Sequence, residues 1–141
     1  MIVTNALYHN PGFLAARALA AESGCAKMQV GAAIIGRDGA LLGAGNNDVE
    51  LPQAVCPREL KGSASGADYE LCWRGCFQGA HAEINAVNHA LTCFPAKSLL
   101  DATVYVWGHT YCCPDCIAYM ERRGITSVVF PIDEIGRNPS V

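Results

Sequence analysis

The segment His81–Leu91 reads HAEINAVNHAL and is predicted to form a helix. Its apolar residues recur at helical spacing and share one face: Ile84, Val87 and Leu91. A second helix is predicted to begin at CPDC, Cys113–Cys116, because proline is favoured in a first turn, and to end at a basic pair followed by Gly124. The apolar run TVYVW at 103–107 separates the two helices and is predicted to be a strand.

The amino-terminal region is interpreted as an ordinary first helix. FLAARALAAES at 13–23 is predicted to be helical, with Asn10 as its N-cap and Pro11 in its first turn. The region lacks the basic leader of a secretory signal, and no apolar run in the chain approaches the ~20 residues that a membrane helix needs. We therefore expect a cytoplasmic protein without a membrane partner.

Three further apolar runs have the length of strands: VGAAII at 30–35, LLGAG at 41–45 and ITSVVF at 125–130. The first two are predicted to form a hairpin, because Asp38-Gly39 between them is a typical turn. The resulting order of helix, hairpin, long loop, helix, strand, helix and strand is typical of an α/β sandwich with a mixed sheet. With no repeat or linker visible, we expect a single domain over residues 1–141.

The composition excludes a broad cationic surface. The chain has 10 basic and 13 acidic residues and a net charge of −3, so we expect no nucleic-acid partner. Charged residues make up only 16% of the chain and apolar residues 51%, which is compatible with burial of some surface in an oligomer.

The chain contains eight cysteines, and three of them fall in a stretch from about Asn46 to Gly79 that has no helical or strand periodicity. A loop of this length in a compact domain is more often functional than idle. Clustered cysteines without a secretory signal indicate metal binding rather than disulfides. The eight are Cys25, Cys56, Cys72, Cys76, Cys93, Cys112, Cys113 and Cys116.

The two helix starts carry a combination of residues that predicts catalytic zinc. One imidazole and two thiolates, from His81, Cys113 and Cys116, would be three zinc ligands and leave a fourth position for water. H-x-E followed by C-x-x-C is the pattern of zinc deaminases, in which the glutamate, here Glu83, carries protons and does not bind the metal. Helix N-termini favour thiolates by their partial positive charge. The alternative is a closed structural zinc site that these residues share with a fourth ligand.

Several segments together resemble the cytidine and deoxycytidylate deaminase family, most closely its phage-type deoxycytidylate (dCMP) deaminases. The resemblance covers most of the chain and is carried by CAKMQVGA at 25–32, GNN at 45–47, HAEINAV at 81–87, CPDC at 113–116 and ERRGITSVVF at 121–130. It implies a three-layer α/β/α sandwich with a mixed central sheet of about five strands. It also implies hydrolytic deamination of dCMP to dUMP with release of ammonia.

The resemblance implies a role for each residue of the zinc pattern. His81, Cys113 and Cys116 would bind the catalytic zinc. A hydroxide formed on this zinc would attack C4 of cytosine. Glu83 would take a proton from the zinc water, pass it to the ring N3 and then help ammonia to leave.

Other residues would hold the substrate. The backbone N–H of Ala82 would meet the ring carbonyl, and Asn47 would hydrogen-bond the sugar hydroxyl, or Asn46 if the register differs by one. The alternative for either asparagine is local backbone bonding in a turn. Three basic residues near the recognised segments are candidates for the phosphate, with solvated surface charges as the alternative: Lys27, Arg58 and Arg74.

One segment departs from the family pattern. Cys112 stands where the family usually has proline, and residues 107–111 make a longer connection than expected between strand and cysteines. Cys112 lacks the C-x-x-C spacing to Cys116, so we do not expect it to bind the metal. Tyr111 and His109 are candidates to touch the base, or else packing residues, and this segment leaves the exact substrate open.

A second, structural zinc is predicted from four remaining cysteines, since some phage-type dCMP deaminases carry one in the corresponding regions: Cys25, Cys56, Cys72 and Cys76. The alternative is that these are small buried residues. Cys93 is interpreted as a core residue, and His89, two turns along the metal helix, as structural.

Alternatives to dCMP within the same chemistry are cytidine, deoxycytidine or a modified dCMP. A zinc-stabilised binding module without turnover is an alternative of a different class. Family members assemble as homo-oligomers, often hexamers, and some respond to dCTP and dTTP, so the resemblance implies an oligomer and possible nucleotide effectors.

Overall fold

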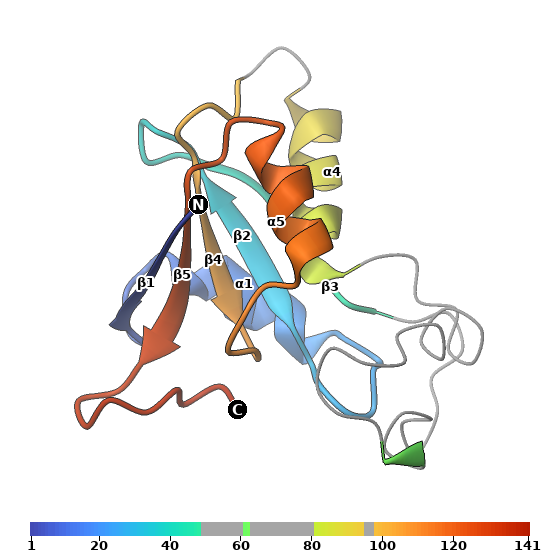
Figure 1. Cartoon of the computed structure of the whole chain (residues 1–141), viewed down its shortest axis with the longest axis vertical. Coiled ribbons are helices and arrows are strands. Elements are labelled where there is room, and N and C mark those ends of the chain that lie inside the picture. Colours follow the sequence, from blue (N-terminus) through green and yellow to red (C-terminus); the bar gives the residue numbers. More distant parts are fainter. Residues whose placement is uncertain (49–60, 63–80, 95–97) are drawn as a thin grey trace.

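The computed structural model describes residues 1–48, 61–62, 81–94 and 98–141 (Figure 1). Most of the stretch predicted as a long loop therefore lies outside the described residues. Within the described part, no helix is long and apolar enough to cross a membrane.

The elements follow in the order β1 (Ile2–Leu7), α1 (Phe13–Ala21), β2 (Gly31–Ile35), β3 (Leu41–Asn46), α4 (Ala82–Cys93), β4 (Thr103–Trp107), α5 (Pro114–Glu121) and β5 (Ser127–Ile132). The strands form one five-stranded sheet in the order β1-β5-β4-β2-β3. β5 is parallel to both of its neighbours, whereas β2 is antiparallel to β3 and β4. The predicted mixed sheet of about five strands between helical layers is confirmed.

Helix α1 covers one face of the sheet. Its first residue, Phe13, is buried and meets the rings of Tyr105 and Trp107 edge-on, with ring centroids 5.1 and 6.0 Å away. The backbone of α1 also approaches β2 very closely, because a Cβ on Gly31 would lie 1.8 Å from the carbonyl oxygen of Ala16. A glycine is therefore needed at this point of β2.

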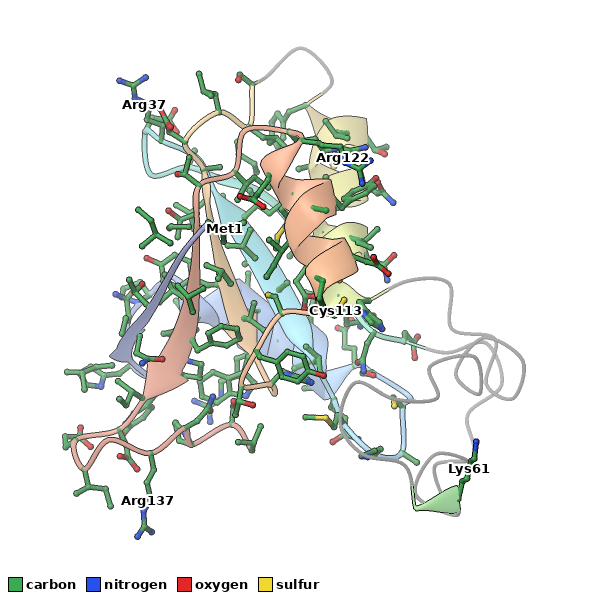
Figure 2. All side chains as sticks on the ribbon, viewed as in Figure 1. Met1, Arg37, Lys61, Cys113, Arg122 and Arg137 are labelled. Atoms are coloured by element: carbon green, nitrogen blue, oxygen red, sulfur yellow. The ribbon has the colours of Figure 1, made fainter. Side chains whose placement is uncertain are left out.

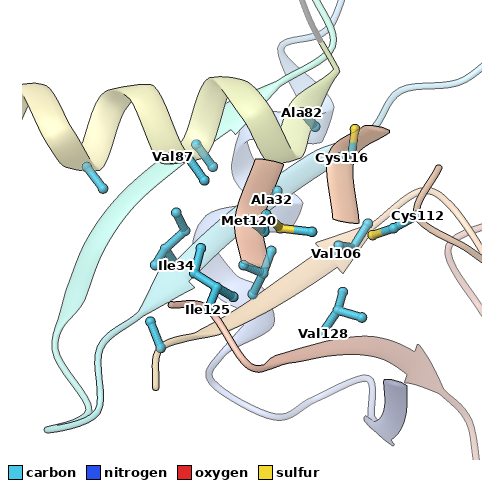
Figure 3. Packing of buried hydrophobic residues seen from close by; sticks show 14 of the residues in the cluster. Ala32, Ile34, Ala82, Val87, Val106, Cys112, Cys116, Met120, Ile125 and Val128 are labelled. Atoms are coloured by element: carbon cyan, nitrogen blue, oxygen red, sulfur yellow. The ribbon is translucent and has the colours of Figure 1, made fainter. Parts of the chain in front are cut away.

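The opposite face carries α4, α5 and the main core (Figure 3). Alternate residues of the strands face these helices, among them Ile34, Val106 and Val128, and Val87 and Met120 pack on them from the two helices. This arrangement fixes the starts of α4 and α5 close to the same end of the sheet (Figure 1).

Helix α4 lies directly on β3 because β3 has two glycines on the face beneath it. A Cβ on Gly43 would lie 2.6 Å from the amide nitrogen of Ala90, and one on Gly45 would lie 2.5 Å from that of Ala86. Any side chain at these positions would meet helix backbone. The sequence GAG in β3 therefore sets the height of α4 above the sheet.

The structure corrects the interpretation of the amino-terminal region. Residues Ile2–Leu7 form strand β1, which pairs with β5 at the edge of the sheet. Almost the whole strand is exposed, so its sequence shows no alternation of buried and exposed residues, and its pairing partner lies at the far end of the chain. Neither fact is visible in a local pattern.

Two predicted element boundaries and the predicted burial of one cysteine also differ from the structure. Helix α1 begins at Phe13 with Gly12 as its N-cap, while the side chain of Asn10 accepts a hydrogen bond from the Gly12 N–H at 2.8 Å in the preceding turn. The last strand lies two residues later than predicted. Cys93 is exposed in the last turn of α4 and is not a core residue, so that interpretation was wrong.

Candidate metal centre

The starts of two helices bring the predicted zinc ligands together. His81 is the N-cap of α4 and Cys113 the N-cap of α5, and both have extended backbones with ψ of 162° and 155°. Neither side chain caps its own helix. Pro114 occupies the first turn of α5, as predicted, and Figure 2 shows Cys113 at the start of this helix.

The three ligand atoms lie within a few ångströms of one another. Nδ1 of His81 is 3.4 Å from Sγ of Cys113 and 3.4 Å from Sγ of Cys116, and the two sulfurs are 3.2 Å apart. Among the described residues, these three form the group that could hold a metal ion.

The group fits zinc by its chemistry and by its size. Tetrahedral zinc with ordinary bond lengths would place the two sulfurs about 3.8 Å apart and each about 3.6 Å from the nitrogen. The three atoms therefore need to separate by only about half an ångström. The described residues supply three ligands, His-Cys-Cys, and three protein ligands with an open fourth position are typical of catalytic zinc.

Glu83 lies in the first turn of α4 and is buried, with 5% of its surface exposed. Burial raises the pKa of its carboxyl group, while a hydrogen bond with Cys116 and the charge of His81 oppose that rise. A carboxyl group beside a metal site with a raised pKa is suited to receive a proton and give it back.

The thiols of Cys113 and Cys116 are hydrogen-bonded to each other, with the two sulfurs 3.2 Å apart. The hydrogen bond between the two thiols is the largest cause that lowers the pKa of Cys113 to about 4, and a hydrogen bond with His81 contributes to this lowering. The same hydrogen bond and burial raise the pKa of Cys116. The lowered pKa of Cys113 favours a thiolate at this site, and a divalent cation would neutralise its charge.

Cys112 stands next to these ligands in the sequence but faces the core, beside Val106 (Figure 3). It is 8% exposed, and burial raises the pKa of its thiol, which keeps it protonated and unsuited to bind a metal.

The two turn asparagines make internal hydrogen bonds. Oδ1 of Asn47 accepts from the Val30 N–H at 2.9 Å and from the Ser23 hydroxyl at 2.6 Å, and its Nδ2 donates to the Met28 carbonyl. Asn47 thereby ties residues 23–30 to the end of β3.

Asn46 is engaged in the same way. Its Nδ2 donates to the Leu19 carbonyl, and its Oδ1 accepts from the N–H of Asp48. The predicted contact of Asn47 or Asn46 with a sugar hydroxyl stays a prediction.

Three more of the predicted substrate-binding residues lie in the described part of the structure near the helix starts: His109, Tyr111 and Ala82. His109 and Tyr111 lie on the connection between β4 and α5, where the two rings meet edge-on with centroids 4.5 Å apart. Nδ1 of His109 accepts the N–H groups of Thr110 and Tyr111, so this ring shapes its own loop. Ala82 is buried in the first turn of α4.

Lys27 and Cys25 are both half-buried in the segment before β2. The remaining candidates lie outside the described residues: Arg58, Arg74, Cys56, Cys72 and Cys76. The second zinc site and the phosphate contacts therefore stay predictions.

The sequence analysis missed one long-range contact near the site. Nδ2 of Asn138, in the segment after β5, donates to the His109 carbonyl at 3.0 Å. The sequence gives no signal for it, because the two residues are far apart in the chain. His89 was interpreted as structural, and its Nδ1 accepts the N–H of Ala44 on β3.

Residues 10–132 match the family described as the cytidine and deoxycytidylate deaminase zinc-binding region. The chain belongs to this family. Membership implies a hydrolase that acts on a C–N bond, and His81, Cys113 and Cys116 form a group that could hold a metal ion.

Solved structures agree with this fold. The apo dCMP deaminase of the cyanophage S-TIM5 is 20% identical, with a TM-score of 0.53 over 82% of this chain and 76% of the phage chain. The same enzyme in complex with dCMP and dUMP is 23% identical, with a TM-score of 0.55 over 82% and 75% of the two chains. No curated protein matches the sequence significantly.

Proposed function

We propose that this protein deaminates dCMP to dUMP and releases ammonia. The observation that carries the proposal is the buried carboxyl group of Glu83 in the first turn of the helix that His81 caps, beside two cysteines with zinc-ligand geometry. The structural likeness to a phage enzyme solved with dCMP and dUMP supports the choice of substrate.

In the proposed reaction, water replaces the amino group at C4 of cytosine. Zinc held by the three ligands would supply a water molecule with a pKa lowered toward ~7 as the nucleophile. Glu83 would take one proton from the attacking water and deliver it to N3 of the ring. It would then move the remaining proton, from the new hydroxyl on C4, to the amino group, so that the C4–N bond breaks, C4 becomes a carbonyl and ammonia leaves.

The direction of these proton transfers follows from the surroundings of Glu83. Burial raises the pKa of the Glu83 carboxyl group, which suits a group that accepts a proton and returns it. The N–H of Ala82, in the first turn of α4, would hold the ring carbonyl in this arrangement.

A substrate panel tests the proposal. The zinc-loaded protein would be offered dCMP, dCTP, deoxycytidine, cytidine and guanine while ammonia release is followed. The proposal predicts turnover of dCMP well above that of the nucleosides. Turnover of nucleosides without dCMP would overturn the nucleotide assignment but keep the zinc chemistry. Bound zinc with no turnover on any of the five would favour the binding module.

The phosphate contact has its own test. Lys27, in the half-buried segment tied down by Asn47, is the described candidate. Lys27→Gln would raise KM for dCMP by about tenfold, as expected for the loss of a charged hydrogen bond, and leave KM for deoxycytidine unchanged. Equal effects on both substrates would remove Lys27 from the phosphate site.

We also propose that the protein self-associates. Strand β1 is an uncharged edge strand with Ile2 63% exposed and Val3 60% exposed, and edge strands of this kind tend to be covered by another chain. Light scattering on Val3→Lys would show a shift to smaller species. An unchanged mass would exclude β1 from the contact.

A further inference from the structure

Helix α4 is fastened to the open edge of β3 by two of its side chains. β3 is an edge strand, so its outward backbone groups have no neighbouring strand among the described residues. The N–H of Ala44 donates to Nδ1 of His89 at 3.0 Å. Nδ2 of Asn85 donates to the carbonyl of Asn46 at 2.8 Å. We call these two hydrogen bonds the α4–β3 clamp.

The clamp lies on the same stripe of α4 as the metal ligand. His81, Asn85 and His89 follow one another at intervals of four residues, which places them on one side of a helix. The N–H of Asn85 donates to the carbonyl of His81 at 3.0 Å, so the clamp residue and the ligand are adjacent in one hydrogen-bonded turn.

The clamp adds two directional hydrogen bonds to the apolar packing beneath α4. Gly43 and Gly45 set the height of the helix, but two glycines offer no side chain to fix its position along the strand. A slide of α4 by one residue, about 1.5 Å, would separate both donor–acceptor pairs. The same slide would carry His81 and Glu83 away from the cysteines on α5.

We propose that His89 and Asn85 are positioning residues that set the place of α4 along β3, and thereby hold His81 against Cys113 and Cys116. Their influence on turnover rests on the proposed function, whereas their influence on metal retention does not.

The test compares substitutions at His89. His89→Asn keeps an acceptor near the position of Nδ1, whereas His89→Leu removes it. Thr92→Ala is the matched control, because Thr92 is exposed on the same helix and its hydroxyl bonds only to the Asn88 carbonyl within α4. Zinc release to a chelating dye and the visible spectrum of the cobalt-substituted protein report on the ligand geometry without any substrate.

The clamp predicts that His89→Leu releases zinc about tenfold faster and shifts the cobalt spectrum, at the lower end of the effects seen when groups that orient metal ligands are lost. Its kcat would fall while KM stays near the original value. His89→Asn and Thr92→Ala would both match the unmodified protein. Amide exchange at Ala44 would be faster in His89→Leu alone.

Two results would overturn the proposal. One is a folded His89→Leu protein with unchanged zinc release and cobalt spectrum. The other, if His89→Leu does not fold, is a His89→Asn protein whose Ala44 amide exchanges freely while zinc release is unchanged. Absence of dCMP turnover in the unmodified protein would contradict the proposed function. It would not contradict the positioning role of His89 and Asn85, because the zinc-release and cobalt measurements test that role without substrate.

Discussion

Replacing Gly45 by alanine tests how the sheet positions the active-site helix. The new Cβ would lie 2.5 Å from the amide nitrogen of Ala86 and 2.7 Å from the carbonyl carbon of Asn85. Ordinary contacts between such atoms are about 3.5 Å or more, so α4 and β3 must separate locally by about 1 Å. Overpacking of this kind typically costs about 1–3 kcal/mol of the free energy of unfolding.

The same displacement acts on the first turn of α4, which carries Glu83. A misplacement of about 1 Å at a reacting group can reduce the rate about a hundredfold. We therefore expect Gly45→Ala to lose both stability, measured by denaturant unfolding, and kcat, measured by ammonia release from dCMP.

Two variants serve as comparisons. Gly43→Ala meets the helix further along, against Ala90, so its loss of stability should be similar and its loss of kcat smaller. Gly39→Asn lies in the turn before β3, where nothing lies within 4 Å and asparagine tolerates the φ of 88°, and it should be neutral. Unchanged stability and kcat in Gly45→Ala would refute the close approach of α4 and β3.

Three further predictions follow from the charges and cysteines of the site. Burial raises the pKa of Glu83 above its ordinary value of 4.5 in the folded state, so the zinc-free Glu83→Gln variant should be more stable than the unmodified protein at pH 8, and this difference should shrink toward pH 4.5. Urea unfolding at several pH values measures the difference, and the absence of this trend would contradict the prediction. Iodoacetamide at pH 6 should alkylate Cys113, whose pKa is about 4, and spare Cys112, with zinc protecting Cys113; equal labelling by mass spectrometry would argue against the thiolate. If Cys25, Cys56, Cys72 and Cys76 hold a second zinc, elemental analysis should find about two zinc ions per chain in the unmodified protein and about one in Cys72→Ser. One zinc ion per chain in both proteins would exclude the second site.

The sequence was sufficient to predict the parts of the fold whose signals are local. The helix at His81 was predicted from its helical repeat of apolar residues, and the helix at Cys113 from the proline in its first turn and the glycine after its end. Gly124 lies in the turn after α5 with a φ of 87°, the left-handed conformation that favours glycine after the end of a helix. That His81, Cys113 and Cys116 come together could be predicted for the same reason, since each half of the group lies at a helix start.

The parts that could not be predicted depend on residues that are distant in the chain. Strand β1 forms because it pairs with β5, and its exposed residues leave no periodic pattern. The hydrogen bonds of Asn47 and His89 join segments that only the folded sheet brings together. Cys93 was assigned to the core by residue type alone, although it lies on the exposed side of the last turn of α4.

The most direct test of the central claim is a comparison of the zinc-loaded protein with its Glu83→Gln variant, with zinc content and ammonia release from dCMP measured on the same samples. The account predicts equal zinc in both, and a loss of turnover in the variant of about 10² to 10⁴-fold, the usual contribution of a general acid–base group. Turnover that survives in Glu83→Gln with zinc in place would contradict the assignment of Glu83 as the proton carrier.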